Sequence, residues 1–321
     1  MAPTEATLTH WFDDYRAFLW GLSYRITGSA ADADDVVQET FMKAYQHAPP
    51  ELAEPRRWLM RVAVNAARDV LRRRKRRPYI GPWLPTPIET GDEDAPPSFE
   101  PIVAGQTLEG RYDLMESASL AFLQALEALT PTQRAVLLLR DVFDYAAAEV
   151  ATVLDTSEGN VRTIHHRARR VMESYESRRA VPTRANRERT EKALQQFLAL
   201  LEAGDVRGIE RMLATDVRAV TDANGEFTAL FRPLSGRLSV ARFFGRIAAS
   251  QRPGTADATI RRINGFPAAD VALGSRTGRR PPRLLLGVDL NDAGEIASVW
   301  VIASASKLAG VPSSHSSARA L

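Results

Sequence analysis

"YAAAEVATVLDTSEGNVRTIHHRARRVME", residues Tyr145–Glu173, contains two helical patterns separated by the short polar turn DTS. Apolar residues recur at helical spacing before the turn and predict the inward face of a first helix. Those residues are Ala147, Val150, Ala151 and Leu154. Ser157 is a suitable N-cap for a second helix that begins at Glu158. The stretch therefore predicts a helix-turn-helix.

The second helix of this pattern has small and polar residues at its N-terminal end and cations further along. Its inward face is predicted at Val161, Ile164, His165 and Ala168, and its outward face at Arg162, Thr163, His166, Arg169 and Arg170. A recognition helix needs small or polar side chains to enter the major groove and cations to hold phosphates. The pattern favours DNA binding over a helical hairpin with a basic solvated face, which stays open as the alternative. His165 is predicted to be a core histidine rather than a base reader or a pH sensor.

A second basic surface is predicted on the helix that opens at Pro55. Side chains that suit phosphates and bases recur there at intervals of three or four: Arg57, Arg61, Asn65, Arg68 and Arg72. Arginine and asparagine on one face combine phosphate contacts with hydrogen bonding to bases. Seven of the ten residues 68–77 are basic, which indicates either a solvated tail or a surface for a polyanion.

The composition limits the class of protein. The chain has 321 residues, a net charge of +3, 45% hydrophobic residues and 25% charged residues, as in a soluble globular protein of two or three domains. It has no cysteine, which excludes disulfides and thiolate metal sites and fits a reducing cytoplasm. No stretch is apolar over the roughly 18 residues that a membrane span requires, and the N-terminus lacks a signal-peptide core. We expect a cytoplasmic protein without membrane association, metal or other cofactor.

Changes in residue pattern along the chain predict its domains. We expect a helical domain over 8–77, a linker over 78–113, a second helical domain over 114–176, an α+β domain over 188–308 and a disordered tail over 309–321. Within the α+β domain, strand-like runs near 216–222 and 227–232 precede a helix at 238–249 and further strands. The fold class is therefore multidomain: two all-α domains followed by an α+β domain, in which a curved antiparallel sheet wraps on helices.

The linker begins with YIGPWLP, residues 79–85, directly after the basic run. Its prolines rule out a helix and make a central strand unfavourable. Its four apolar side chains, Tyr79, Ile80, Trp83 and Leu84, would expose a sizeable patch on an idle linker. We expect this segment to pack on another surface; a stiff spacer is the alternative.

The chain resembles the extracytoplasmic-function (ECF) sigma factors of bacterial RNA polymerase. DADDVVQETF (Asp32–Phe41) is similar to the part of region 2 that docks on the polymerase clamp helices. RRWLMRVAVNAARDVLRRRKRR (56–77) is similar to the part of region 2 that reads the −10 element, and 129–172 is similar to region 4. The resemblance covers roughly residues 8–175, in the family's order and spacing. It implies a sigma factor that binds core RNA polymerase and directs promoter-specific transcription initiation, with no catalysis of its own.

The resemblance also implies roles for residues at matching positions. Asp32, Asp35, Gln38 and Glu39 would contact polymerase; Asn65, Arg68, Asp69, Arg72 and Arg73 would read and hold the −10 element; Ser157, Glu158, Asn160, Arg162, Thr163, His166 and Arg167 would meet the −35 element. Acids in the first turns of a helix also favour its dipole, so a structural role is the alternative for the first group. Asp69 orients an arginine in the alternative interpretation, since phosphate repels a carboxylate.

YIGPWLP further resembles a linker signature of SigJ-type ECF factors, which carry a fused C-terminal SnoaL-like (NTF2-like) domain. In that subgroup the fused domain replaces a separate membrane anti-sigma factor as regulator. The resemblance implies that Tyr79, Trp83 and Leu84 pack against this domain in the free protein and against polymerase in the holoenzyme. Two segments thought to contact the sigma core depart from the subgroup: SASKL (304–308) replaces NPDKL, and DANGEF (222–227) replaces a Gly-rich turn.

Two other functions stay open on the sequence. A helix-turn-helix repressor independent of polymerase is one, although the acidic DADDVVQE helix argues against it. A polyketide-cyclase-like enzyme with a DNA-binding head is the other, with candidate carboxylates at Asp216, Asp222, Glu226, Asp257 and Asp289, none of them in a recognisable acid/base pair. A small-molecule ligand of the C-terminal domain is favoured over catalysis. It stays open as a partner beside core RNA polymerase and promoter DNA.

Overall fold

A computed structural model describes residues 3–49, 52–76, 79–91, 114–250, 256–274 and 280–313. The chain divides into two compact units. The helical unit comprises Met1–Pro78, Gly91–Ala118 and Phe122–Ser177, and the sheet unit comprises Tyr79–Thr90, Ser119–Ala121 and Arg178–Leu321. Segment 79–90, expected as linker, therefore belongs to the sheet unit. The rest of the predicted linker from 92 to 113 lies outside the described residues.

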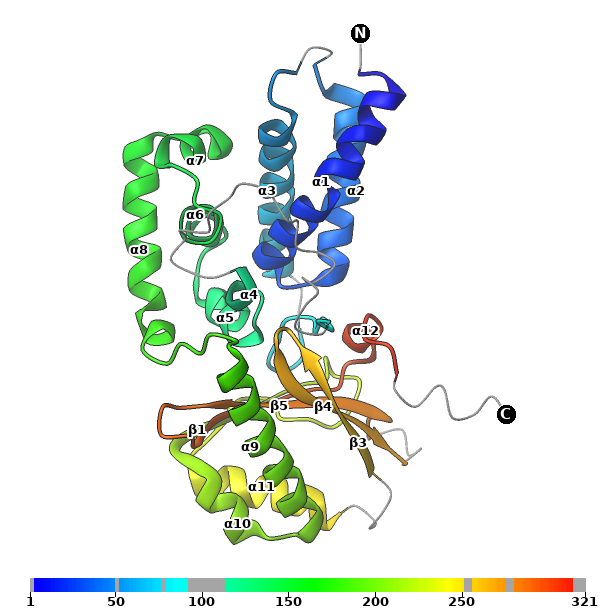
Figure 1. The fold of residues 1–321 in the computed structure, drawn as a ribbon, viewed down its shortest axis with the longest axis vertical. Coiled ribbons are helices and arrows are strands. Elements are labelled where there is room, and N and C mark those ends of the chain that lie inside the picture. The colour runs from blue at the N-terminus through cyan, green and yellow to red at the C-terminus, as the bar shows by residue number, and fades with distance from the viewer. Residues whose placement is uncertain are drawn as a thin grey trace, which may run out of the picture. The chain divides into compact units, whose positions relative to one another are not determined.

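The described helices up to residue 177 follow the predicted order. They are α1 (Glu5–Thr27), α2 (Ala30–His47), α3 (Pro55–Arg74), α4 (Leu114–Ser117), α5 (Leu120–Ala125), a 3-10 turn at Leu126–Ala128, α6 (Pro131–Asp141), α7 (Ala147–Leu154) and α8 (Glu158–Glu176). Figure 1 shows α1, α2 and α3 side by side, and α7 turning into α8. The predicted all-α class of this part of the chain and its helix-turn-helix are confirmed.

Local residue chemistry sets the limits of these helices. Gly28 ends α1 with a φ of 69°, and Ser29 begins α2 by accepting a hydrogen bond from the Asp32 N–H. Thr130 and Gln133 form a capping box at the start of α6. In the helix-turn-helix, Asp155 ends α7 in the left-handed region with a φ of 53°, which aspartate tolerates better than most residues.

The sheet unit packs three helices on one face of a curved sheet. Its elements are α9 (Arg184–Ala203), α10 (Val206–Met212), β1 (Leu213–Asp222), β2 (Leu234–Ser235), α11 (Arg237–Ala249), β3 (Ala256–Ile263), β4 (Phe266–Leu273), β5 (Arg283–Leu290), β6 (Ile296–Ile302) and α12 (Ala305–Leu308). The six-stranded sheet has the order β2-β1-β6-β5-β4-β3. Only the β1–β6 pair is parallel among these described strands; the other pairs are antiparallel. The predicted α+β class is confirmed.

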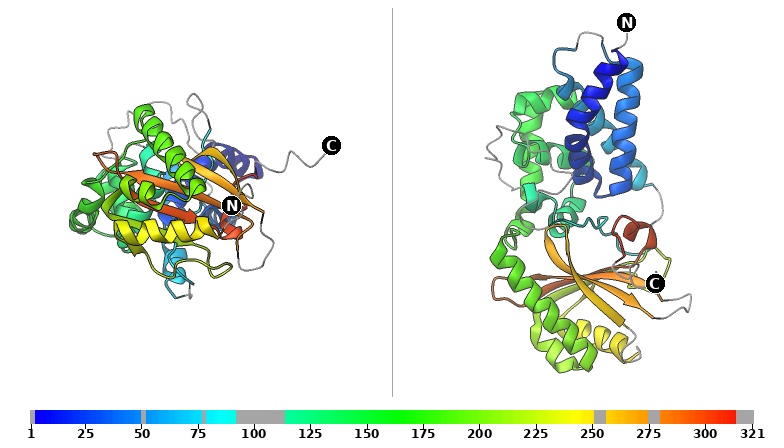
Figure 2. Two further views of the ribbon diagram at one scale, coloured as in Figure 1. Left: turned by 90° about the horizontal axis from the view of Figure 1, so that it is seen from below. Right: turned by 45° about the vertical axis from the view of Figure 1, so that its right-hand side comes forward.

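The two faces of this sheet are covered differently. Helices α9, α10 and α11 cover one face, and α12 lies on the opposite side (Figure 2). The helix-covered face is a closed apolar core built around Leu194, Phe197, Ile209, Val240 and Phe244 with inward residues of the strands. The opposite face carries a second apolar cluster that includes Leu84, Trp300, Ile302, Leu308 and Val311. The segment predicted to pack on another surface thus contributes Leu84 to this second cluster.

Two sequence predictions are wrong in this unit. The run 227–232 is not a strand but part of an exposed loop in which Phe231 is 78% exposed. Its residues of high β propensity pair with no neighbouring strand there, and β propensity alone does not stabilise a strand without packing. The tail predicted to be disordered from residue 309 is ordered up to 313, where Val311 is buried and the Pro312 carbonyl accepts hydrogen bonds from Arg261 and Arg283. Residues 314–321 lie outside the described part.

None of the described helices combines the length and apolar content that a membrane span requires.

Gly287 provides a test of how tightly the second cluster is packed. A Cβ at this position would lie 2.0 Å from the Trp300 ring, a distance that forces the ring or the strand to move. We expect Gly287→Ala to lower the free energy of unfolding of the sheet unit by about 1–3 kcal/mol, measured by denaturant titration. Gly310→Ala is the control, because a Cβ there meets nothing within 4 Å. Equal stability of the two variants would contradict the packing described.

Candidate functional site

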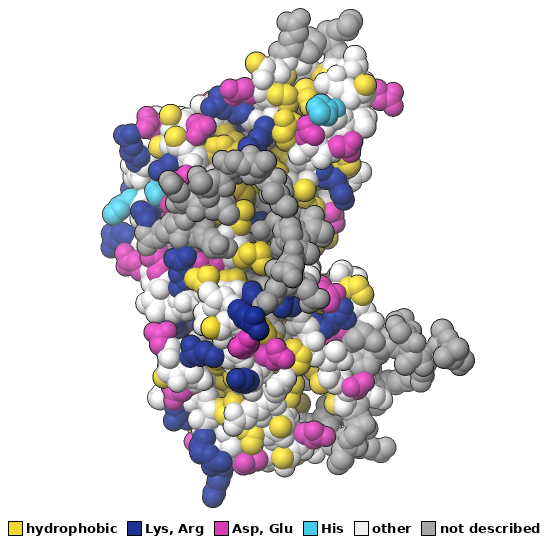
Figure 3. Space-filling view, viewed as in Figure 1, with side chains coloured by type: hydrophobic (Ala, Val, Ile, Leu, Met, Phe, Trp, Pro, Cys, Tyr) yellow, Lys and Arg dark blue, Asp and Glu magenta, His cyan; other side chains and the backbone are white. Residues whose placement is uncertain are grey.

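The N-terminal half of α8 presents the residues predicted to meet the −35 element. Ser157, Asn160, Arg162, Thr163, His166 and Arg167 are exposed and Glu158 is half-buried. Ser157 caps the helix by accepting from the Asn160 N–H at 3.2 Å, and Glu158 pairs with Arg162 at 2.5 Å. Basic and histidine side chains gather along the edge of the molecule that α8 forms (Figure 3). The arrangement exposes donors and cations on the outward face of α8.

The inward face of α8 holds the helix-turn-helix together. Val161, Ala168 and Met172 are buried, as the apolar pattern indicates. His165 is half-buried, and its Nε2 lies 2.7 Å from Asp141 Oδ1 at the end of α6. The Arg169 side chain lies 3.5 Å from the other oxygen of the same carboxylate. His165 therefore orients α8 on α6, which is the structural role predicted for it.

The residues predicted to read the −10 element lie on α3 but differ in exposure. Asn65, Asp69, Arg72 and Arg73 are exposed, whereas Arg68 is half-buried. Asp69 Oδ1 pairs with Arg72 Nη1 at 2.5 Å, so this carboxylate does orient an arginine. Arg68 donates to Asn65 Oδ1 at 3.1 Å and to the Thr132 hydroxyl of α6 at 2.9 Å. Burial and the neighbouring Arg72 lower the pKa of Arg68, and Asp69 opposes that shift.

The predicted polymerase contacts lie on α2 beside an apolar groove. Asp35 and Gln38 are exposed, and Asp32 and Glu39 are half-buried. An open groove of about 540 Å³ runs between α1 and α2, lined by Phe12, Arg16, Trp20, Asp34, Val37, Gln38, Phe41, Met42, Tyr45 and Gln46. Met42 and Tyr45 are 54% and 68% exposed, which is unusual for such large apolar side chains. Of the four predicted contacts, only Gln38 lines the groove.

The apolar residues of this groove were not predicted from the sequence. The core face of α2 is fully supplied by Ala33, Val36, Val37, Thr40 and Ala44. Phe41, Met42 and Tyr45 are further apolar residues of α2. They lie outside that core face, on the side of Gln38. Such an excess on a helix that already has a complete inward stripe is the sequence signal for a docking surface.

In the sheet unit, one buried carboxylate gathers the segments that the sequence singled out. Asp222 at the end of β1 is 0% exposed and accepts from the Tyr79 hydroxyl at 2.6 Å and from the Leu84 N–H at 2.7 Å. Lys307 of α12 donates at 2.6 Å to Oδ2, the carboxylate oxygen that also accepts from the Leu84 N–H. The Asn224 N–H adds a longer contact of 3.3 Å. We call Asp222, Lys307, Tyr79 and Leu84 the linker clasp.

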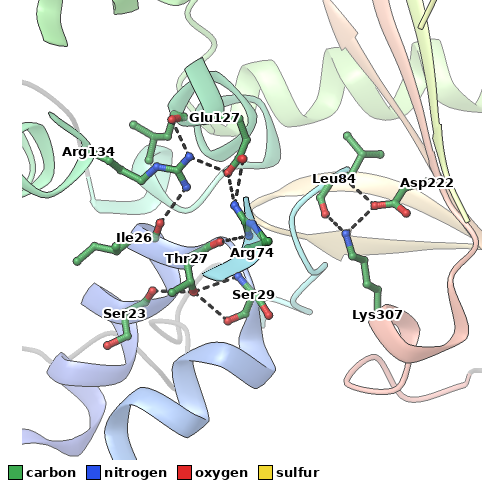
Figure 4. A network of polar contacts seen from close by, with 11 residues as sticks. Ser23, Ile26, Thr27, Ser29, Arg74, Leu84, Glu127, Arg134, Asp222 and Lys307 are labelled. Atoms are coloured by element: carbon green, nitrogen blue, oxygen red, sulfur yellow. Dashed lines mark hydrogen bonds and ion pairs between the residues drawn. The ribbon is translucent and has the colours of Figure 1, made fainter. Parts of the chain in front are cut away.

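Lys307 completes the clasp with contacts to the aromatic residues of the same segment. Its ammonium lies 4.4 Å from the centroid of the Trp83 ring and 5.1 Å from that of Tyr79, within the range of cation–π attraction. It also donates to the Leu84 carbonyl and to the Asp222 carboxylate (Figure 4). One cation is thus shared by a carboxylate, a carbonyl and two rings. Removing either member of such a buried pair costs about 3–5 kcal/mol, because the other charge is left uncompensated.

The far end of segment 79–90 is held at the turn between β3 and β4. Ile88 donates to the Asn264 side chain at 2.9 Å, and Thr90 donates to the Arg262 carbonyl at 2.9 Å. Glu89 forms a bidentate pair with Arg261 at 2.5–2.6 Å. The segment is thus fixed at both ends on the sheet face opposite α9–α11.

The two segments that depart from the subgroup pattern also meet at the clasp. Glu226 of DANGEF accepts from the Ser304 hydroxyl at 2.6 Å and from the Ala305 N–H at 2.9 Å. Asp222 and Lys307 belong to the same two segments. These polar contacts join the two segments to each other and to residues 79–84.

The five carboxylates considered for acid/base chemistry do not form a pair. Asp222 and Glu226 serve the contacts just described, and Asp216 and Asp257 are exposed. Asp289 on β5 is half-buried, and burial raises its pKa to about 6 against the opposing effect of the Ser298 hydroxyl. No cluster of His, Cys, Asp and Glu suited to a metal ion occurs among the described residues.

Comparisons with known proteins agree with this arrangement. Residues 11–77 match the model of Sigma-70 region 2, and residues 119–172 match that of Sigma-70 region 4. The chain is 32% identical over 308 residues to ECF RNA polymerase sigma factor SigJ of Mycobacterium tuberculosis, covering 94% of this chain and 93% of that protein. It is 35% identical over 217 residues to ECF RNA polymerase sigma factor SigG of the same organism, covering 60% of this chain and 55% of that protein.

The crystal structure of the Mycobacterium tuberculosis extracytoplasmic function sigma factor SigJ superimposes with a TM-score of 0.72 at 28% identity. The match covers 95% of this chain and 99% of that one, so it includes both units. The predicted order of two helical sigma domains and a SnoaL-like (NTF2-like) domain is thereby confirmed.

The clasp predicts a defined change in backbone protection. In Asp222→Asn, the neutral side chain no longer compensates Lys307, and the Leu84 N–H loses its charged acceptor. We expect hydrogen exchange at the Leu84 amide to accelerate at least about tenfold, the equivalent of 1.4 kcal/mol. Asp216→Asn is the matched control, since this aspartate is exposed. Unchanged protection in Asp222→Asn would show that the carboxylate does not hold the segment.

Asp289 predicts a pH dependence of stability. Its pKa is raised from 3.8 to about 6 in the folded chain, so the folded state binds the proton more tightly than the unfolded state. Its stabilising contribution is therefore complete below about pH 4 and is lost as the pH rises through about 6. Asp289→Asn should remove this contribution to the pH dependence of stability. The melting temperature of the variant should therefore exceed that of the parent by more at pH 7 than at pH 4. The same gain at both pH values would contradict the assignment.

Proposed function

The chain belongs to the extracytoplasmic-function (ECF) sigma factors of RNA polymerase, and on that premise we propose how its own residues serve and regulate transcription initiation. As a member of that family it binds core RNA polymerase and directs promoter-specific initiation. The family is one of transcription factors rather than enzymes.

The promoter contacts are proposed on α8 and α3. Arg162, Thr163 and Asn160 lie exposed at the entering end of α8, where side chains reach base edges. Ser157, Glu158, His166 and Arg167 complete the −35 surface. Asn65, Arg72 and Arg73 supply the exposed part of the −10 surface, while Asp69 positions Arg72 and Arg68 reaches the −10 element only when its contact with Thr132 is released.

The polymerase contact is proposed to combine the acidic side of α2 with the groove between α1 and α2. Asp35 and Glu39 supply charge, and Gln38 connects that side to the exposed apolar residues Met42 and Tyr45. A surface with an apolar centre and a charged rim is typical of specific protein interfaces. A helix-turn-helix repressor would have no use for this surface, which is why the repressor alternative is not favoured.

We propose that the sheet unit modulates the sigma activity by holding segment 79–90. The single observation that carries this proposal is the linker clasp, in which Asp222 and Lys307 bind Tyr79 and Leu84, while Lys307 also contacts the Trp83 ring. These residues follow α3 directly in the sequence and precede region 4. While the sheet unit holds them they are not available to polymerase, so the sheet unit and polymerase compete for one segment.

A small-molecule ligand is not needed for this modulation. The space between α9–α11 and the sheet is filled by buried apolar side chains such as Phe197 and Phe244. We therefore base the proposal on the clasp rather than on a ligand cavity.

We further propose that the protein acts in the cytoplasm, where core polymerase is found.

In vitro transcription with purified core polymerase and the promoter of its own gene tests the proposal. The full chain is compared with Asp222→Asn, with Lys307→Met and with a truncation ending at Tyr175. If the clasp restrains initiation, the two point variants should raise specific transcript yield several-fold and approach the truncation. If it assists, both should lower the yield. If both variants gave the same yield as the full chain, the clasp would not regulate initiation.

Core binding is scored in the same samples, with Tyr45→Ala as the variant of the groove. A rim substitution would weaken binding little, whereas an exposed aromatic at the centre of an interface typically costs 1 kcal/mol or more, about fivefold in affinity. Failure of every version to bind core polymerase would contradict the polymerase surface itself, independently of the clasp.

A further inference from the structure

Positive charge in this chain is concentrated after the helix-turn-helix. Residues 178–321 contain 22 Lys and Arg against 13 Asp and Glu, whereas residues 1–177 contain 20 Lys and Arg against 26 Asp and Glu. The part of the chain that carries the proposed promoter contacts is therefore acidic overall, and the excess of cations belongs to the part that forms most of the sheet unit. Twenty of the 22 cations after residue 177 are arginines, whose planar side chain can donate to two phosphate oxygens at once.

Four of these arginines lie on the outer side of the helices that cover the sheet (Figure 2). Arg207 and Arg211 are one turn apart on α10, and Arg242 and Arg246 are one turn apart on α11. All four are exposed. The buried positions of the two helices are other residues: Gly208, Ile209, Val240, Ala241, Phe244 and Gly245. Helical spacing therefore directs both arginine pairs away from the sheet.

The two arginine pairs belong to one surface because α10 and α11 pack directly on each other. The contact is close at Gly245, where a Cβ would lie 2.5 Å from Val206 Cγ2 of α10. Val206 and Gly245 are the chain neighbours of Arg207 and Arg246. Packed helices lie about 8–10 Å apart, a distance that arginine side chains from both helices bridge. We call Arg207, Arg211, Arg242 and Arg246 the arginine face.

The chain itself supplies little negative charge to the arginine face. Helix α11 contains no Asp or Glu. Arg211 lies 3.9 Å from Asp205, in an exposed pair that solvent screens. Among the described residues, the side chains of Arg207, Arg242 and Arg246 form no ion pair; Arg246 donates only to the Arg242 carbonyl, at 3.3 Å. Like charges four residues apart on a helix destabilise it, and an external anion would relieve that repulsion.

The joint between α8 and α9 limits how far the sheet unit can lie from the DNA that α8 meets. Helix α8 ends at Glu176 and α9 begins at Arg184. An extended chain advances at most about 3.6 Å per residue, so this joint spans no more than about 30 Å. When α8 lies on the −35 element, the sheet unit is therefore tethered beside the neighbouring duplex, which raises its effective concentration there.

We propose that the arginine face is a further DNA-binding surface, which holds phosphates of the promoter duplex beside the −35 element. Phosphate contacts strengthen and position a complex without reading its sequence, so this surface adds affinity and leaves promoter choice to α3 and α8. The location of the bound duplex rests on the proposed placement of α8 on the −35 element. The contact itself is separate from the clasp and from the surfaces of the helical unit.

Three double variants of the full-length chain test the arginine face. Arg242→Gln/Arg246→Gln removes two of its charges, and Arg242→Lys/Arg246→Lys keeps them. Glutamine and lysine are about as favourable in a helix as arginine, so α11 is preserved in both. The matched control is Arg218→Gln/Arg232→Gln, which removes two exposed arginines of the sheet unit that lie on β1 and in the loop before β2, outside the arginine face.

Each variant is assembled with purified core polymerase, and binding to a fluorescent duplex is followed by anisotropy over a range of salt concentrations. The duplex carries the promoter of the protein's own gene and the DNA upstream of it; a second duplex has a scrambled −35 element. Each phosphate contact adds about 0.9 to the slope of log K against log salt concentration. The affinity of each variant for core polymerase is measured separately.

We expect the glutamine variant to lose about 1.8 from this slope and to bind the duplex at least about fivefold more weakly at low salt, while the lysine variant and the control keep the parent values. Equal slopes in the glutamine variant and the control would overturn the inference, and so would an equal loss in the lysine variant. Weaker binding to core polymerase with an unchanged salt slope would also overturn it and would assign the arginine face to an acidic surface of polymerase.

The scrambled duplex separates these results from a failure of the proposed function. If the parent holoenzyme does not distinguish the two duplexes, the assignment of α8 to the −35 element fails. The difference in salt slope between the glutamine variant and the control is still read on both duplexes, because phosphate contacts do not depend on sequence.

Discussion

A carboxylate buried away from water must be matched by donors, and in the sheet unit that requirement fixes the path of the chain at Asp222. The side chain is fully buried and its donors come from β1's own turn, from the segment after α3 and from α12. An unmatched charge in this position would cost several kcal/mol, a large fraction of the stability of an ordinary domain. The docking of Tyr79–Leu84 and of α12 therefore depends on the Asp222 carboxylate.

The helical unit uses the same physics at Glu127 and Arg134. Arg134 has a side chain only 3% exposed and is matched by a carboxylate and by two carbonyls, Ile26 and Leu126. Buried charge pairs contribute little net stability compared with apolar packing of the same volume, but they demand particular partners. The apolar core around Phe197 and Phe244 has the opposite character, since its separation would expose a large apolar area without compensation. Apolar packing thus holds this core together, whereas the positions of Asp222 and Arg134 depend on matched charges.

Local chemistry explains what could be predicted from the sequence. Gly28, Ser29, Thr130 and Pro131 set helix limits through their own backbone preferences, and the apolar stripe of α7 and α8 is a matter of spacing alone. The SnoaL-like class of the sheet unit came from resemblance. Partners far apart in the sequence could not be predicted, because no local rule selects Lys307 rather than another cation for Asp222. The wrong strand assignment at 227–232 and the ordered residue Val311 have the same origin, since the absence of a partner decided the first and the presence of one the second.

The prolines of segment 79–90 connect its composition to its proposed role as a reversible contact. Pro82, Pro85 and Pro87 restrict the backbone to extended conformations whether or not the segment is bound, so docking it removes less conformational entropy than docking a flexible chain would. The same residues offer no N–H, which confines the hydrogen bonds of the segment to a few places such as Leu84, Ile88 and Thr90. A segment that loses little entropy on binding and is held at few points can exchange one surface for another without unfolding either. The composition that excludes a helix or a central strand after α3 thus suits the proposed exchange of this segment between the sheet unit and polymerase.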